Sequence, residues 1–311
     1  MKQNQIEQFY DYYDEIADLL YRNYKVPYLE GMNEAFHLLL DDTLLGSYST
    51  EDVQTMRQAK EAIIAIPFER EDIRKSVQLG MLKAFKHTNA SNSLITPDSI
   101  GIFLAYLIKK FHPTKTIGSL FDPLLGSGNL VYTIANQLDA TPEVFGVDQD
   151  HLMCQIARNL GDLLEYENHV FFQDTFTFYN TGFDVLVTDM PIENEGPYLP
   201  YQVLNHHIDS VKPGGFVFAL IENDFFEQDG SDTFREEIAK KGQIIGLLAL
   251  PSDLFTTHPK SIFILRRHHD NPHPMDGFLL VELPSFRDED GMTKILYQID
   301  QWIAQRKDDL R

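Results

Sequence analysis

From about residue 116 onwards, short runs rich in β-branched and aromatic residues alternate with segments of helical periodicity. Alternation of this kind is typical of a mostly parallel sheet wrapped by helices, in which ligands bind at the carboxyl ends of the strands. The sequence therefore predicts a doubly wound α/β domain. The predicted strands cover residues 116–121, 144–147, 170–172, 185–187, 216–221, 244–250 and 261–265. Helical segments between them include residues 130–138, 151–164 and 201–211.

The chain before this alternation has a different pattern. Between Ile6 and about Lys86, apolar residues recur at spacings of three and four, and Pro or Gly breakers divide the segment into about four amphipathic helices. Near the end, residues 277–284 are typical of one more strand and residues 293–307 of an amphipathic helix. The predicted domain limits are 1–88 for the helical domain and 89–311 for the α/β domain.

Composition excludes several classes of protein. The 311 residues include 47 acidic and 26 basic side chains, and the net charge of −21 opposes docking on nucleic-acid phosphates. No apolar stretch approaches the roughly 20 residues of a membrane span, and the polar N-terminus lacks a secretory signal, so we expect no membrane partner and a cytoplasmic location. The single cysteine, Cys154, excludes an internal disulfide and a Cys-based zinc site. The histidines lack the spacing that joins a metal on one helix face, so no metal site is predicted.

A glycine-containing turn follows the first predicted strand and leads directly into a helix. It carries Asp122, Gly126 and Gly128, and its glycines permit positive φ and close approach of a ligand to the backbone. Val131 occupies the place of the third glycine in a dinucleotide fingerprint, which disfavours pyrophosphate. The carboxylate of Asp122 would repel phosphate but can hold the ammonium group of an amino acid.

Four successive predicted strands end in or just before an aspartate: Asp122, Asp148, Asp174 and Asp189. Asp148 stands twenty residues beyond Gly128, which suits an acceptor for the vicinal hydroxyls of a ribose. Asp174 can accept from the exocyclic amine of adenine. Adenosine with a positive amino-acid tail, which is S-adenosylmethionine, fits this set better than NAD or ATP.

From about Ser93 to Arg267 the chain resembles the class I methyltransferases of the N6-adenine DNA methylase group, similar to the modification subunits of type I restriction systems and their short bacterial relatives. The resemblance lies in Thr96-Pro97, in the Asp-Pro-x-x-Gly-Ser-Gly turn at 122–128, in the segment 213–219 and in the Leu-Pro-x-x-Leu-Phe at 250–255. It implies a Rossmann-like fold with a seven-stranded sheet and an S-adenosylmethionine cofactor. The cofactor-binding residues that it implies, together with the acids above, are Thr96, Pro97, Asp122, Pro123, Gly126, Ser127, Gly128, Asp148, Gln149, Asp174, Thr175 and Asp189.

The catalytic element of that family is Asn/Asp-Pro-Pro-Tyr/Phe, whose first side chain and following carbonyl accept from the target amine while the aromatic ring stacks on the flipped base. Here the element reads Asp189-Met190-Pro191-Ile192. Asp189 is the predicted acceptor, with the carbonyls of Asp189 and Met190 as partners. Ile192 removes the stacking ring, and Tyr198 or Tyr201 can supply an aromatic side chain from the following loop.

Three functions remain open from the sequence. The first is an S-adenosylmethionine-dependent N-methyltransferase that acts on adenine N6 in DNA, although the net charge weakens DNA as a partner. The second is a cofactor-binding, catalytically impaired regulatory or scaffold protein that works through its helical part. The third is a methyltransferase acting on a protein or a small molecule. The N-terminal helices are the expected surface for a homodimer or a protein partner.

Overall fold

Four helices form the N-terminal part of the computed structural model, which describes residues 4–88, 95–192, 197–255, 257–269 and 275–306. Helix α3 begins after Ser49, whose side chain accepts a hydrogen bond from the Asp52 amide, as expected for an N-cap. Tyr13 and Phe36 meet edge to face inside this bundle, with ring centroids 5.5 Å apart. The helices span Gln5–Tyr24 (α1), Tyr28–Asp41 (α2), Thr50–Ile64 (α3) and Arg70–Thr88 (α4).

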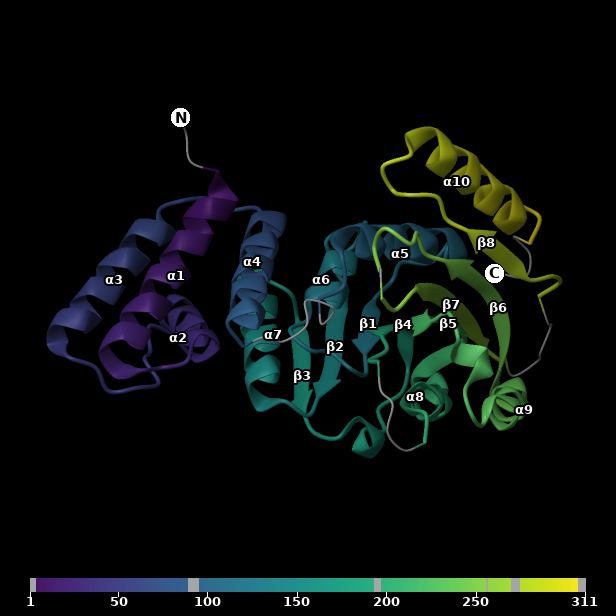
Figure 1. Ribbon diagram of the computed structural model, residues 1–311, viewed down its shortest axis with the longest axis horizontal. Coiled ribbons are helices and arrows are strands. Elements are labelled where there is room, and N and C mark those ends of the chain that lie inside the picture. Colours follow the sequence, from purple (N-terminus) through teal and green to yellow (C-terminus); the bar gives the residue numbers. More distant parts are fainter. Residues whose placement is uncertain (1–3, 89–94, 193–196, 256, 270–274, 307–311) are drawn as a thin grey trace.

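The described residues from 95 onwards fold around a sheet of eight strands in the order β3-β2-β1-β4-β5-β7-β6-β8 (Figure 1). All neighbouring strands are parallel except β7, which runs antiparallel to both β5 and β6. The strands span Ser119–Asp122 (β1), Glu143–Asp148 (β2), Asn168–Phe172 (β3), Phe183–Asp189 (β4), Val211–Glu222 (β5), Gly242–Ala249 (β6), Lys260–Arg267 (β7) and Leu279–Glu282 (β8).

The sheet is covered on both faces because its strands are apolar on both. In β5, Phe216 and Phe218 belong to one buried cluster, whereas Val217 and Ala219 belong to another, as the two-residue period of a strand requires. Helices α5 (Asp98–Phe111), α6 (Asn129–Ala135) and α7 (His151–Leu163) share the first cluster, and α8 (Leu199–His207) and α9 (Ser231–Lys241) share the second. The predicted doubly wound, mostly parallel α/β fold with a helical N-terminal domain is confirmed.

The expectation of seven strands in the sheet needs one correction. The additional strand predicted near residues 277–284 does not stand apart but joins the sheet as β8, pairing in parallel with β6, so the sheet has eight strands. Its Leu279 is buried while Leu280 is exposed, which is typical of an edge strand with one covered face. Helix α10 (Glu289–Ala304) packs against β8 and α5 (Figure 1).

The helical part packs on the sheet domain through α2 and α4, which contact α7. Asn33 of α2 accepts a hydrogen bond of 2.8 Å from the buried side chain of Asn159 on α7. The predicted boundary at residue 88 stays a prediction, and residues 89–94 lie outside the described residues. Within the described ranges, no helix is both long and apolar enough to cross a membrane.

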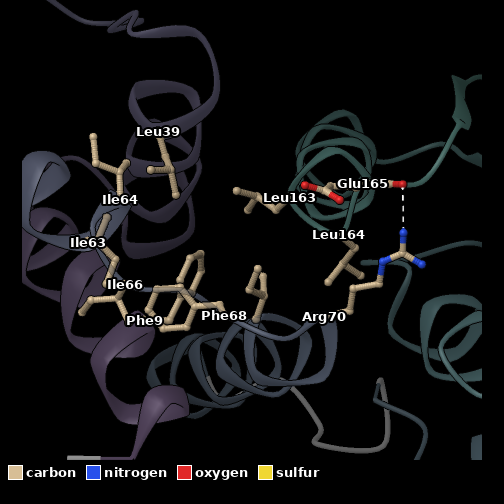
Figure 2. Close-up of a pocket in the computed structure, with 11 residues that line it drawn as sticks. Phe9, Leu39, Ile63, Ile64, Ile66, Phe68, Arg70, Leu163, Leu164 and Glu165 are labelled. Atoms are coloured by element: carbon tan, nitrogen blue, oxygen red, sulfur yellow. Dashed lines mark hydrogen bonds between the residues drawn. The ribbon is translucent and has the colours of Figure 1, made fainter.

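An apolar cleft of about 380 Å³ lies where the two parts meet. Figure 2 shows Phe9, Ile63 and Phe68 on the wall formed by the helical part and Leu163 on the wall formed by the end of α7. Arg70 closes one end, where its guanidinium donates to the carbonyl oxygen of Glu165 at 3.3 Å (Figure 2). None of the residues that line this cleft belongs to the predicted cofactor set.

Candidate functional site

Three predicted site acids are the last residues of parallel strands that lie near one another. Asp122 ends β1, Asp148 ends β2 and Asp189 ends β4, and β1 pairs with both of the other strands. Because parallel strands end at the same edge, the three carboxylates gather there. Asp174 follows β3 on the outer side of β2. We call these four residues the acidic edge.

The glycine turn, residues 122–128, connects β1 to α6 above the acidic edge. Gly126 and Gly128 have positive φ angles of 53° and 78°, and Gly128 is the N-cap of α6. A Cβ at Gly128 would lie 2.6 Å from the ring of Tyr132, so this glycine allows close packing within the fold. A Cβ at Gly126 would meet no atom within 4 Å, so the backbone there is open to a ligand.

Asp148 holds the turn in place. One of its carboxylate oxygens accepts from the Gly126 amide at 2.8 Å, and the other accepts from the Asp150 amide at 2.8 Å. A carboxylate has about four lone-pair sites, so each oxygen can still accept a further donor such as a ribose hydroxyl. Gln149, the next residue, is exposed. Asp148 therefore shapes the turn and remains available to a ligand.

Asp122 is a buried acid. Its residue is 2% exposed, and one carboxylate oxygen accepts from the Leu124 amide at 3.0 Å. Burial chiefly, with a smaller contribution from the negative charges of Asp189 and Asp148, raises the pKa of Asp122 to about 7, even though hydrogen bonds from Leu124 and Thr188 lower it. A positively charged ligand group near this carboxylate would offset both causes. Pro123, beside it, is buried, and Ser127 is half-buried.

Asp174 and Thr175 make local contacts. The Asp174 side chain accepts from the Phe176 amide at 2.9 Å, so it caps the short 3-10 helix at Thr175–Thr177, and its residue is exposed. The Thr175 hydroxyl lies 2.7 Å from Nε2 of the buried His207, whose ring packs on Phe121 of the second core cluster. The predicted cofactor role of Thr175 therefore depends on its backbone rather than on its hydroxyl.

Thr96 connects the start of α5 to the acidic edge. Its hydroxyl donates to Oδ2 of Asp189 at 2.7 Å, and its carbonyl accepts from Nδ2 of Asn129 at 3.1 Å. Pro97 is the residue before α5 and fixes the backbone there. The resemblance-derived Thr-Pro element and the acid at the end of β4, which lie 93 positions apart in sequence, are thus in direct contact.

Lys260 is the site residue that the sequence analysis missed. Its ammonium group forms an ion pair with Oδ1 of Asp189 and donates to the Met190 carbonyl oxygen at 3.0 Å. It begins β7, and because β7 runs antiparallel, its first residue lies at the edge where β4 and β5 end. A lysine directly before the predicted strand 261–265 was the only sequence signal.

The remainder of the Asp-Met-Pro-Ile element does not present a ring to the acidic edge. The Met190 side chain is buried in the second core cluster, while Pro191 and Ile192 are half-buried. Tyr201 is buried and stacked on Phe234 with ring centroids 4.5 Å apart, so it serves packing and cannot supply the missing aromatic face.

Tyr198 is half-buried and packs edge to face on Tyr201 at 4.8 Å. Burial raises the pKa of Tyr198, and the charges of Glu222 and Asp224 raise it further. Of the two tyrosines proposed as replacement aromatics, only Tyr198 remains near the surface.

A second missed element is the buried Arg74 cluster, which consists of Glu71, Arg74, Asp98 and Asn129. The guanidinium of Arg74 is fully buried and donates to Glu71, to Asp98 at 2.8 and 3.1 Å, and to Asn129 at 2.8 Å. Arg74 lies on α4, between the buried Ile73 and Val77, so a cation replaces an apolar residue on the packed face. The cluster links the helical part to the residues that follow Pro97 and Gly128.

The sequence has two short basic segments, one at residues 109–115 and one at residues 266–269, and most of their cations are engaged within the chain. Lys109 pairs with Asp139 at 2.8 Å and Lys110 with Asp300 at 2.7 Å. Arg266 is buried, and Arg267 donates to the carbonyl oxygens of Asp209 and Val211. Lys109, Lys110, Arg266 and Arg267 are therefore held by partners within the chain rather than directed at a nucleic-acid backbone.

The residues at the acidic edge fit S-adenosylmethionine rather than a nucleotide with phosphates. The open space over Gly126 admits a ligand, and the buried carboxylate of Asp122 favours an ammonium group and disfavours phosphate. Asp148 offers oxygens for hydroxyl groups. When bound there, the cofactor would supply an electrophilic methyl group on a sulfonium.

Comparisons with known proteins agree with this geometry. Residues 7–85 match the profile of the YtxK N-terminal helical domain. The uncharacterised protein YtxK of Bacillus subtilis (strain 168) is 29% identical and aligns with 99% of this chain and with its own whole length. The crystal structure of a candidate class I S-adenosylmethionine-dependent methyltransferase from Listeria monocytogenes is 28% identical, covers 96% of this chain and 99% of its own, and has a TM-score of 0.85.

A more distant structure shares the fold. The methyltransferase subunit of a type I restriction-modification system from Streptococcus thermophilus is 16% identical, with a TM-score of 0.64 over 96% of this chain and 73% of its own. This chain therefore has the fold of the class I S-adenosylmethionine-dependent methyltransferases, and its N-terminal residues 7–85 match the helical domain of the YtxK type.

Proposed function

We propose that the protein binds S-adenosylmethionine at the acidic edge and transfers the methyl group to an amine nitrogen held by Asp189 and the Met190 carbonyl. One juxtaposition carries the proposal: a Cβ at Gly126 would meet no atom, Asp148 accepts from the Gly126 amide, and Asp122, Asp148 and Asp189 end neighbouring parallel strands, with Thr96 bonded to Asp189. We infer that Asp122 faces the ammonium group of the cofactor, Asp148 its ribose, and Asp174 its adenine.

Methyl transfer from a sulfonium needs little covalent chemistry from the protein. It needs the nucleophile in line with the methyl group, at about 3 Å, and an acceptor that orients the amine. The carboxylate of Asp189 and the adjacent carbonyl oxygen of Met190 can accept two N–H donors of one amine. We call these two oxygens the acceptor pair. Its carboxylate need not act as a full base, because a methylated amine becomes acidic and can lose its proton late.

Adenine N6 in DNA is the acceptor that the sequence resemblance implies, and it is the first substrate to test. The half-buried Ile192 offers no stacking face, which removes roughly 1–3 kcal/mol per base of binding, and the basic segments are paired within the chain. These two observations favour the alternatives: an aliphatic amine of a protein or small molecule, or a cofactor-binding protein without transfer.

Cofactor binding is tested by thermal unfolding with S-adenosylmethionine. A ligand at 100 times its Kd stabilises the native state by about 2.7 kcal/mol, so the Tm should rise with concentration. Transfer of labelled methyl groups to unmethylated DNA, to protein fractions and to simple alkylamines then identifies the acceptor class. An unchanged Tm at millimolar cofactor would rule out the proposal.

Two glycines offer a matched test of the turn. Gly126 and Gly182 both have positive φ, at 53° and 94°, and both have open space where a Cβ would stand. Changing either residue to alanine should cost about 1–2 kcal/mol of stability through backbone strain. Only Gly126→Ala should weaken cofactor binding, by about tenfold or more (at least ~1.4 kcal/mol), because its methyl group enters the open space over the turn. Isothermal titration of the two variants decides this, and equal losses of affinity would place the ligand elsewhere.

A further inference from the structure

The acceptor pair already holds an amine, which is the side chain of Lys260. This lysine is 3% exposed, and its ammonium touches both members of the pair, the Asp189 carboxylate and the Met190 carbonyl oxygen at 3.0 Å. Buried lysines are rare unless they are paired, so the contact is a built feature of the fold. One small site cannot hold two nitrogens on the same oxygens.

The second carboxylate oxygen of Asp189 is also engaged from within the chain. Oδ2 of Asp189 accepts from the Thr96 hydroxyl at 2.7 Å, while Oδ1 is taken by Lys260. The Lys260 ammonium lies 5.7 Å from the ring centroid of Phe255, which adds a cation–π contact. The environment therefore suits a compact cation with several N–H donors and an aliphatic stem.

This environment differs from one built for adenine. An exocyclic adenine amine is neutral and planar, and the base to which it belongs requires a stacking face that Ile192 does not provide. A primary ammonium group needs no stacking, and the carboxylate of Asp189 neutralises its charge. The Lys260 side chain ends in such a primary ammonium group, and it occupies the position beside Asp189.

We propose that the acceptor pair is a binding site for a primary aliphatic ammonium group, and that Lys260 fills it from within until an external amine displaces the lysine side chain. The inference rests on the proposed function for the identity of the acceptor pair, and it specifies the substrate class as primary aliphatic amines. For methyl transfer, the bound ammonium group must first give one proton to the Asp189 carboxylate, which frees the lone pair that attacks the methyl group as its bond to sulfur breaks. Displacement also makes Lys260 a specificity-determining residue, since a ligand gains entry only by matching the ammonium that it replaces.

The test is chemical rescue of Lys260→Ala by n-propylammonium, which matches the atoms that the substitution removes. The variant should unfold at a lower temperature than the wild type, because Asp189 is left half-buried without its cation. Added n-propylammonium chloride should raise the Tm of the variant in a saturable way, by roughly 3 °C at tenfold excess over its Kd. Sodium chloride at equal ionic strength should not raise the Tm of the variant in this way, and neither should 1-propanol.

Two control variants separate this site from general effects of amines. Lys110→Ala removes a lysine that is 40% exposed and pairs with Asp300, and it should show no rescue. Lys260→Ala combined with Asp189→Asn should lose the rescue, because the carboxylate is gone. Rescue equal in all three variants, or absent from Lys260→Ala, would overturn the proposal.

Labelling of the wild-type protein covers the case in which Lys260→Ala does not fold. Under native conditions, an amine-reactive reagent should modify Lys212, whose side chain is 54% exposed, and leave Lys260 unmodified, as read by peptide mass spectrometry. Modification of Lys260 at the rate of Lys212 would overturn the proposal. Both experiments omit S-adenosylmethionine, so they can fail while cofactor binding in the wild type succeeds, and the reverse also holds.

Discussion

Replacing Arg74 with methionine is expected to destabilise the protein by about 3 kcal/mol, because it leaves the half-buried carboxylates of Glu71 and Asp98 and the buried Asn129 without their cationic partner. The Arg74 guanidinium is fully buried, and it bonds to both carboxylates and to Asn129. The methionine side chain replaces the apolar stem of the arginine, so the loss of stability reports the removal of the charge rather than the creation of a cavity. Urea unfolding should show a lower midpoint.

A surface arginine provides the control for this prediction. Arg57 pairs with Asp42 at 3.1 Å, and the two side chains are 49% and 54% exposed. Arg57→Met should cost less than about 1 kcal/mol, because exposed ion pairs contribute little. Similar midpoints for the two variants would mean that the Arg74 cluster is not a buried network.

The second large effect concerns the pH dependence of cofactor binding through Asp122. The pKa of this carboxyl is raised from 3.8 to about 7 in the folded protein, chiefly by burial. Between these values the folded state holds a proton that the unfolded state has released, so this group makes the free protein less stable as pH rises towards 7. Binding of an ammonium group requires the ionised form, so cofactor affinity should rise over the same window.

The expected size follows from the ionised fraction of Asp122. With a pKa of about 7, that fraction grows about eightfold between pH 6 and pH 7.5, while an α-amino group stays mostly protonated. Isothermal titration across this range should show a comparable gain in affinity. Asp122→Asn should bind weakly and flatten the profile. An equal slope in wild type and variant would assign the pH dependence to another group.

Much of the fold follows from local patterns in the sequence. Alternating strands and helices predict a parallel sheet, and parallel strands end at one edge, so Asp122, Asp148 and Asp189 were predicted to lie together without coordinates. The helical domain follows from spacings of three and four. In both cases, the signal lies in residues that are near one another in the chain.

The residues that the sequence analysis missed depend on contacts between distant segments. Lys260 reaches Asp189 across 71 positions, and only because β7 runs against its neighbours. Arg74 looks like one more surface charge of an amphipathic helix until α4 packs against α6. The eighth strand was expected as a strand, but its place beside β6 is a matter of topology that periodicity does not encode.

The direction of β7 has a consequence for how this family of folds can diversify. Its apolar residues 262–265 are buried between β5 and β6, which fixes the pairing because a slip by one position would turn every side chain to the opposite face. Position 260 is therefore anchored by its neighbours regardless of its own side chain. A single codon change there can exchange a cation for a hydroxyl, an amide or a methyl group beside Asp189 and the Met190 carbonyl, and so alter the chemistry at this position while the architecture stays as it is.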